Sequence, residues 1–178
     1  MTLQDAFTSP VNKEELWLFG FRIDPDRESP DVYTLILHGD KDRPLVADGQ
    51  IVFFSRLELA SSALNLGGID IEQLGSVPKD VDLLCDLAKT LYLINSENID
   101  PSATILNCLN TVFDLVRATG LSVPIQYKRV LYALADHLTF NREFSNFLFQ
   151  ENIARSTITD AILWCIGAIV SKAKLLRE

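Results

Sequence analysis

Residues that catalyse reactions or hold metals are scarce in this chain. Its 178 residues include two histidines, His38 and His137, and three cysteines without a CxxC pair. Zinc sites and nucleophile–base pairs need such residues at short, fixed spacings, and the sequence has none. It also lacks the glycine-rich phosphate loops and the HExxH and GxSxG motifs. We therefore expect no metal site, no cofactor and no catalytic residue, and the sequence favours a non-enzymatic protein.

Long uncharged hydrophobic runs are also absent. The longest spans residues 161–170, whereas a bilayer-spanning helix needs about 20 apolar residues. The N-terminal segment has no basic stretch followed by an apolar one, so it is not a secretory signal. Apolar residues surround Cys85, Cys108 and Cys165, which predicts buried free thiols of the kind found in a reducing compartment. These features predict a cytoplasmic protein with no membrane partner.

Positive charge is sparse in the first part of the chain. Residues 1–75 carry six basic and thirteen acidic side chains, whereas residues 76–178 carry ten and eleven. Nucleic-acid binding depends on a basic patch that releases counterions from phosphates, and no such patch is present. We therefore expect no nucleic-acid partner. An acidic surface instead favours a protein partner with a basic face, because long-range charge steers the encounter.

The acidic side chains gather in segments that we expect to be loops. They are Asp24, Asp26, Glu28, Asp31 and Asp48. In a simple meander, the loop at residues 24–31 and the turn at Asp48 emerge at the same edge of the sheet, so these carboxylates form a candidate partner surface. Calcium also favours clusters of oxygens, but this loop lacks the glycine and glutamate of an EF-hand. Turn-forming aspartates explain the pattern better.

Residues 14–75 have the pattern of a small β lobe closed by one helix. Period-two alternation predicts strands at residues 16–23, 33–37, 45–47 and 51–54. Gly20 separates two registers of the first strand, as a β-bulge would. Apolar residues at helical spacing then run from Leu57 to Leu64 and stop at Gly67. We expect an antiparallel meander with one helix, preceded by a loose arm at residues 1–13.

Residues 76–178 repeat their apolar positions every three or four residues. This spacing predicts helices at about 78–91, 101–119, 124–138, 141–148 and 156–176. The whole chain is therefore expected to have an α+β fold. In it, the small β lobe is followed by an all-α bundle of five helices, which packs on the lobe as one unit.

The last predicted helix differs from the others because residues 161–170 are apolar on every side. Such a helix is either the centre of the bundle or lends one face to a partner. Trp164 lies within it, and Phe149 lies at the end of the preceding short helix, off the face that carries Phe144 and Phe147. Trp164 and Phe149 are therefore candidate residues for self-association, as in a homo-oligomer.

Two functions follow from these features. The first is a non-enzymatic protein that acts by surface contact, in a regulatory or accessory role. The alternative is a small-molecule-binding or catalytic domain whose site lies between the sheet and the helical bundle. Its polar candidates are Tyr33, His38 and Asp40 on the second strand and its turn, joined by His137 if the fold brings this residue to them.

Overall fold

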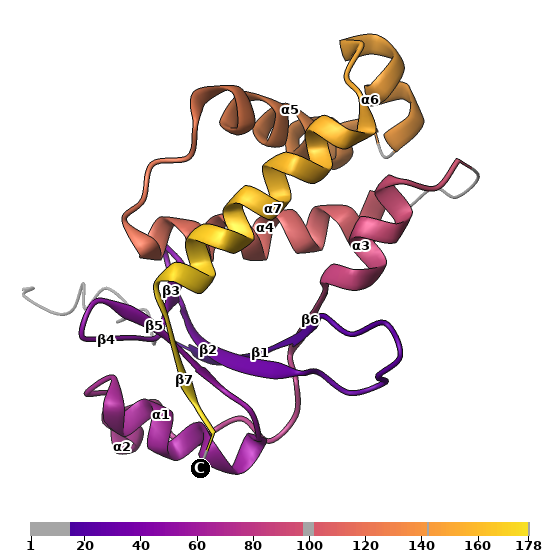
Figure 1. Ribbon diagram of the computed structural model, residues 1–178. Helices are drawn as coiled ribbons and strands as arrows, with labels where there is room; N and C mark the ends of the chain where they lie inside the picture. The colour runs from indigo at the N-terminus through magenta and orange to yellow at the C-terminus, as the bar shows by residue number, and fades with distance from the viewer. Residues whose placement is uncertain (1–14, 98–101, 142, 178) are drawn as a thin grey trace, which may run out of the picture.

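The computed structural model describes residues 15–97, 102–141 and 143–177 (Figure 1). The fold is mixed α+β, with a seven-stranded sheet that carries helices on both faces. This confirms the expected fold class. The loose arm predicted at residues 1–13 and the predicted helix start at residues 100–101 lie outside the described residues.

The sheet combines strands from both ends of the chain. The strands are β1 (Glu15–Arg22), β2 (Val32–His38), β3 (Arg43–Pro44), β4 (Val46–Ala47), β5 (Gln50–Phe54), β6 (Leu83–Asp86) and β7 (Ala173–Leu176). β1 and β2 are antiparallel neighbours at the centre. β6 pairs in parallel with β1, and β7 pairs in parallel with β5. Two strands from the second part of the chain therefore extend the sheet formed by the first part.

Helices form a thin layer on one face of the sheet and a thick layer on the other (Figure 1). They are the 3-10 turn η1 (Leu57–Leu59), α1 (Ala60–Leu66), α2 (Ile71–Leu74), α3 (Leu87–Ile94), α4 (Ser102–Thr119), α5 (Ile125–Asn141), α6 (Phe144–Glu151) and α7 (Arg155–Ser171). α1 packs below the sheet. The helices α3 to α7 lie above it, and we call them the helical layer.

Strands β6 and β7 correct the prediction for the second part of the chain. The helix predicted at residues 78–91 is wrong up to residue 86, because Leu83–Asp86 form a strand and the helix begins only at Leu87. The helix predicted to residue 176 ends at Ser171. Short apolar segments fit a strand as well as a helix, so spacing alone does not separate the two. At the C-terminal end, pairing with the open edge of β5 makes the segment a strand. Ile51 N–H donates to Lys172 O, and Ser55 N–H donates to Leu176 O.

The strands that follow β2 do not form a simple meander. β3 and β5 both pair antiparallel with β2, at different points along its length. Leu45 links the two, because its N–H donates to Leu35 O and its carbonyl accepts from Val52 N–H. The β4–β5 hairpin therefore projects from one broken strand. Asp48 lies at its tip with φ 52°, rather than at the sheet end that carries the loop at residues 24–31.

Gly20 is required for a close contact and does not form the predicted bulge. The β1–β2 register runs without interruption through its pairing with Tyr33. A Cβ atom at Gly20 would lie 2.7 Å from Cγ of Pro30 and 3.3 Å from a methyl group of Val81. The missing side chain thus lets the loop before β2 and the segment before β6 close over β1.

Two hydrophobic cores lie on opposite faces of the sheet. The α1 face carries the buried residues Leu18, Leu35, Val52 and Phe54, which pack against Ala60, Ala63 and Leu64. The face toward the helical layer carries Phe19, Phe21, Ile36, Ile51 and Phe53, which pack against α4, α7 and their neighbours. Side chains of adjacent strand residues point to opposite faces, so one short strand such as β5 contributes to both cores.

Candidate functional site

A polar cluster lies at the end of β2 and in the turn that follows it, next to α4. His38 Nδ1 is 2.7 Å from Asp42 Oδ1, and the imidazole stacks on the indole of Trp17 with ring centroids 4.1 Å apart. The His38 side chain is 40% exposed and that of Asp42 is 28% exposed. Trp17 holds the ring from one side and Asp42 fixes one of its nitrogens, so His38 has a defined orientation at the surface.

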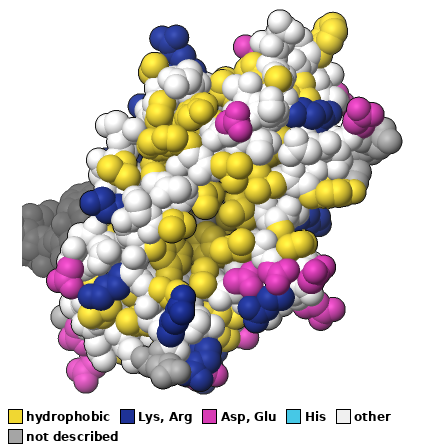
Figure 2. All heavy atoms as spheres, in the orientation of Figure 1, with side chains coloured by type: hydrophobic (Ala, Val, Ile, Leu, Met, Phe, Trp, Pro, Cys, Tyr) yellow, Lys and Arg dark blue, Asp and Glu magenta, His cyan; other side chains and the backbone are white. Residues whose placement is uncertain are grey.

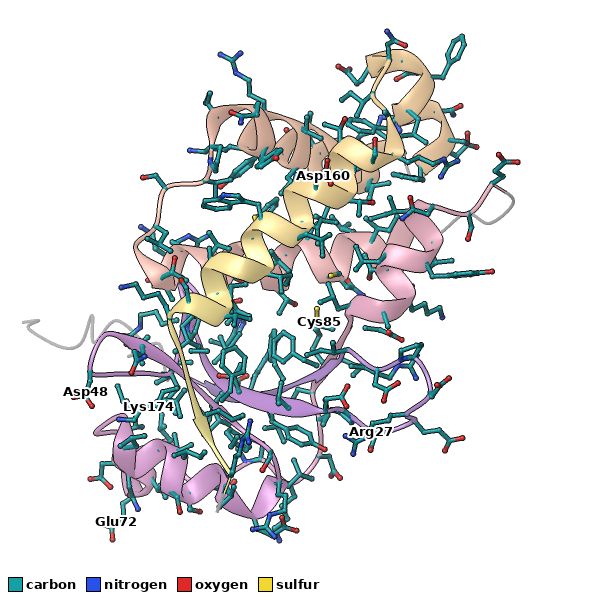
Figure 3. All side chains as sticks on the ribbon, viewed as in Figure 1. Arg27, Asp48, Glu72, Cys85, Asp160 and Lys174 are labelled. Carbon is teal, nitrogen blue, oxygen red and sulfur yellow. The ribbon has the colours of Figure 1, made fainter. Side chains whose placement is uncertain are left out.

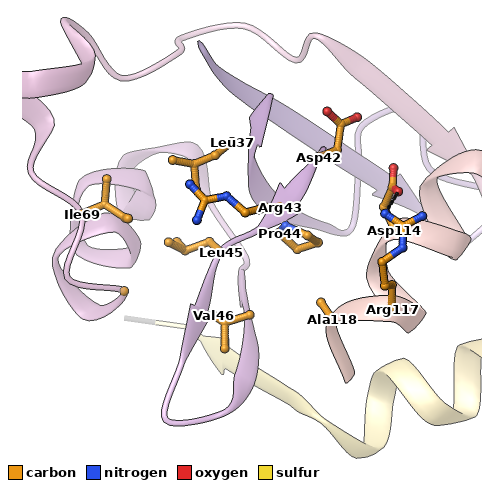
Figure 4. Close-up of a pocket in the computed structure, with 11 residues that line it drawn as sticks. Leu37, Asp42, Arg43, Pro44, Leu45, Val46, Ile69, Asp114, Arg117 and Ala118 are labelled. Atoms are coloured by element: carbon orange, nitrogen blue, oxygen red, sulfur yellow. Dashed lines mark ion pairs between the residues drawn. The ribbon is translucent and has the colours of Figure 1, made fainter. Parts of the chain in front are cut away.

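A cavity of about 370 Å³ adjoins this cluster. Its lining residues are Leu37, Asp42, Arg43, Pro44, Leu45, Val46, Gly67, Ile69, Asp114, Arg117 and Ala118 (Figure 4). Asp114 and Arg117 of α4 form an ion pair of 3.2 Å. Burial raises the pKa of Asp114, and the nearby Asp42 carboxylate raises it further against the opposing effect of Arg117. The cavity thus combines an apolar wall with two carboxylates, Asp42 and Asp114, and two guanidinium groups, Arg43 and Arg117.

The structure brings only part of the predicted polar site together. Tyr33 is buried on the α1 face, where it stacks on Phe54. It lies five residues from His38 along β2, a distance of roughly 17 Å, and points to the opposite face. Asp40 is exposed in the turn after β2. Of the predicted residues, His38 contacts Asp42, which lines the cavity.

His137 has a separate structural setting between α5 and α6. Its Nε2 atom is 2.8 Å from the carbonyl oxygen of Glu143, and its ring lies 5.4 Å from that of Phe147. These contacts join the end of α5 to the start of α6. Among its described contacts none involves β2 or the cavity, so the structure does not unite His137 with His38.

The loop acids organise their own turn. Asp31 accepts the backbone N–H groups of Ile23 and Asp24 at 2.7 and 2.9 Å, and it pairs with Arg27 at 2.9 Å. Hydrogen bonds from Asp24 N–H and then Ile23 N–H lower the pKa of Asp31. The Asp31 carboxylate is therefore committed to holding the loop.

Asp48 lies apart from this loop. It pairs with Lys174 of β7 at 3.1 Å. Figure 3 shows these two residues on the opposite side of the view from Arg27, which belongs to the loop. The predicted neighbourhood of Asp48 with Asp24, Asp26, Glu28 and Asp31 is therefore not formed. The partner surface formed by the loop residues themselves stays a prediction.

The outer face of α7 carries exposed apolar residues. The inner face of α7 is buried in the core. Its buried residues are Ile158, Ala161, Ile162, Cys165, Ala168 and Ile169. On the opposite side, Leu163 is 48% and Val170 is 66% exposed, and a Cβ atom added to Gly167 would meet nothing within 4 Å. Figure 2 shows hydrophobic side chains gathered across the middle of the face that α7 crosses. We call Leu163, Ile166, Gly167 and Val170 the α7 outer face.

The two residues predicted for self-association have different environments. Trp164 is partly buried against the helical-layer core. Phe149 is 89% exposed on α6, and Phe140 near the end of α5 is 82% exposed. Phe144 and Phe147 are buried, so the aromatic segment splits between core and surface.

Within residues 15–97, 102–141 and 143–177, no group of three His, Cys, Asp or Glu side chains is arranged to hold a metal ion. In these ranges no single helix is long and apolar enough to cross a bilayer, and α6 with α7 meets those criteria only as a pair bent by 106°.

Sequence reasoning missed most of the cavity cluster. The spacing of His38 and Asp42 across a glycine-containing turn was a usable signal. Asp114 gave none, because it lies among ordinary helix-surface charges and approaches Asp42 only through the packing of α4 on the sheet. Compared with known proteins, the chain matches no family model, no curated protein and no solved structure.

Proposed function

We propose that this protein acts without catalysis, through protein–protein contact, and that it pairs with a second copy of itself through the α7 outer face. The observation that carries the proposal is the exposure of Leu163 and Val170 on a helix whose other side is central to the core. Large apolar side chains grouped on one exposed face are the usual mark of an interaction surface.

The geometry of α7 suits a two-fold pairing. Leu163, Gly167 and Val170 follow the spacing that places residues on one face of a helix. Gly167 lies between the two larger residues and leaves space for another backbone. In an antiparallel pair with its two-fold axis beside Gly167, Leu163 of each copy contacts Val170 of the other. A two-fold interface uses the same patch twice, so one self-complementary helix face is sufficient.

The charges near the two ends of α7 add no ion pair to this arrangement. Asp160 is exposed one turn before Leu163 (Figure 3). Lys172, the C-terminal cap, follows Leu163 by nine positions and therefore lies on the opposite side of the helix. The pairing therefore depends on the apolar contacts.

The expected association is weak and reversible. One helix face is smaller than the roughly 1,200–2,000 Å² buried in standard stable interfaces, and the net charge of −8 on each copy opposes pairing. We therefore expect a dimer whose population rises with protein concentration. Sedimentation velocity of the full chain over a wide concentration range measures this directly, and a strict monomer throughout contradicts the proposal.

Two variants separate the α7 outer face from other apolar surface. Leu163→Asp should abolish pairing while leaving the circular dichroism spectrum unchanged, because its side chain is half exposed. Phe149→Asp is the matched control on α6 and tests the contribution expected of this residue from the sequence. Loss of the dimer in Phe149→Asp but not in Leu163→Asp would move the interface to α6.

A second candidate function is supported by the cavity at the junction of β2 and α4. Its lining combines an apolar wall with two carboxylates and two arginines, which suits a small molecule with a hydrocarbon body and a charged group. Titration with hexylamine, followed by the fluorescence of Trp17 in a Trp164→Phe background, tests this function. We expect saturable binding that hexanol does not reproduce and that Asp114→Asn weakens. Equal responses to both compounds would exclude a charge-dependent site.

A further inference from the structure

Two of the three cysteines meet inside the protein, although 22 residues separate them in the chain. The Sγ atom of Cys85 on β6 donates a hydrogen bond to the Sγ atom of Cys108 on α4, over 3.5 Å. Each residue is 1% exposed. The pair therefore lies at the contact between the sheet and the helical layer, where no function described so far uses it.

The two thiols have different electrostatic environments. The hydrogen bond with Cys108 and burial raise the pKa of Cys85 well above its ordinary value. The hydrogen bond from Cys85 outweighs burial and lowers the pKa of Cys108. Cys108 is therefore the better nucleophile of the pair, since the thiolate is the reactive form.

We propose that Cys85 and Cys108 form a reversible redox modification site, in which a hydroperoxide oxidises the two thiols to a disulfide between β6 and α4. The inference rests on the contact of the two sulfur atoms, which need to approach from 3.5 Å to about 2.05 Å to form the bond. It goes beyond self-association and does not depend on it.

The reaction balances with a hydroperoxide as the only co-reactant. The Cys108 thiolate attacks the terminal oxygen of the hydroperoxide, the O–O bond breaks, and the alkoxide takes a proton and leaves as an alcohol. The sulfur of Cys85 then attacks the resulting sulfenic acid. The S–S bond forms, the S–O bond breaks, and hydroxide leaves as water with the Cys85 proton. The two thiols lose two electrons and the hydroperoxide gains them.

The third cysteine provides an internal comparison. Cys165 on α7 borders a different cavity, together with Phe113 and Tyr132, and burial raises its pKa to about 11. It has no sulfur neighbour among the described residues. A thiol in this setting stays protonated and is unreactive. The bond is therefore expected to be specific for Cys85 and Cys108 and to leave Cys165 reduced.

The test is oxidation of the full-length native protein with hydrogen peroxide. We expect free thiols, counted after denaturation, to fall from three to one. Intact mass should show the loss of two hydrogen atoms, and peptide mapping without reductant should find Cys85 joined to Cys108. Dithiothreitol should reverse all three changes. Because the pair is buried, the reaction is expected to be slow and limited by local opening.

Several outcomes would overturn the proposal. The first is that all three thiols stay reduced in the native protein while those of the unfolded protein react. The second is a sulfinic acid in place of the disulfide. The third is a disulfide that includes Cys165 or a second chain. A Cys165→Ser variant should form the same bond at the same rate. The oxidised wild-type chain should also melt at a higher temperature than the reduced chain, since the bond restricts the unfolded state.

Discussion

The two faces of the sheet are closed in different ways. The α1 face is covered by α1, which follows β5 directly, so residues 16–71 supply nearly all of its core. The opposite face is covered by α3 to α7, and its core reaches from Phe19 to Ile169. One sheet therefore carries a core made of sequence neighbours and a core made of distant segments. The local sequence pattern predicts the first core. The second core forms only when segments that are distant in the sequence pack together.

Strands β6 and β7 join the two regions. Each belongs to the second part of the chain but pairs with a strand of the first part. β6 lies at one edge of the sheet and β7 at the other. Detachment of the helical layer would also remove β6 and β7 from the sheet on which the α1-face core packs. We therefore expect both cores to unfold in a single transition, and substitutions matched across the sheet test this coupling.

The largest expected effect comes from truncating neighbouring phenylalanines on β5. Phe54 is fully buried on the α1 face, and Phe53 is 8% exposed on the other face, where it packs edge-on against Phe21. Phe54→Ala should lower the free energy of unfolding by about 4–5 kcal/mol and Phe53→Ala by about 3–4 kcal/mol. Urea denaturation monitored by circular dichroism and by tryptophan fluorescence measures both values.

Coincidence of the two optical transitions decides whether the cores are coupled. Each variant should shift the midpoint without splitting the curve or changing its slope. Phe149→Ala is the control, because this side chain is 89% exposed and its removal should change stability by less than about 0.5 kcal/mol. A separate early transition in Phe54→Ala would show that the α1 face folds independently of the helical layer.

The same contrast explains which parts of the fold the sequence predicts. Strands β1, β2 and β5 and helix α1 follow from alternation and spacing because their neighbours in space are neighbours in sequence. Leu83–Asp86 and Ala173–Leu176 have no local signal that separates strand from helix. Their conformation is decided by β1 and β5, which offer open edges. Distant pairing therefore overrides local preference at both ends of the second part of the chain.

The second-largest effect is expected at β6, where Asp86 has two roles. Its carboxylate accepts from Lys89 N–H at the start of α3 and pairs with Arg22 of β1. Arg22 Nε is already buried without a hydrogen-bond partner among the described residues. Asp86→Ala removes a helix cap and leaves a partly buried cation, so it should cost about 2–3 kcal/mol.

Variants at both edges of the sheet refine this estimate. Asp86→Asn retains the capping oxygen and should recover about 1 kcal/mol of the loss. At the opposite edge, Lys174→Ala removes the ion pair with Asp48, whose side chain is 81% exposed, and should cost no more than about 1 kcal/mol. Thermal unfolding of the three variants compares them. Equal losses for Asp86→Ala and Lys174→Ala would contradict the distinction between a buried and an exposed edge.

The candidate sites follow the same rule as the fold. His38 was predictable because a histidine near a glycine-containing turn is visible in the sequence, and the outer face of α7 was predictable because residues 161–170 are apolar on all sides. The approach of Asp114 to Asp42, and of Cys108 to Cys85, arises from the packing of α4 on the sheet. The spacing of residues within α4 predicts neither contact.

The smallest expected effects come from two aspartates whose pKa values move in opposite directions. Backbone hydrogen bonds lower the pKa of Asp31 below 3.8, so its ionised form stabilises the fold at neutral pH. That contribution is lost as pH falls below 3.8 through the lowered pKa. Burial raises the pKa of Asp114 above 3.8, so its ionised form is unfavourable in the fold. That cost disappears as pH falls from the raised pKa toward 3.8.

The asparagine variants should therefore show opposite pH dependences. At neutral pH, Asp31→Asn is expected to lose about 1 kcal/mol, and its deficit relative to the wild type should shrink on acidification. Asp114→Asn is expected to differ from the wild type by less than about 1 kcal/mol, and the wild type should gain stability relative to it as pH falls toward about 4. Urea denaturation across this range distinguishes the two. Parallel profiles would mean that the loop and the junction of β2 with α4 do not impose opposite environments on their carboxylates.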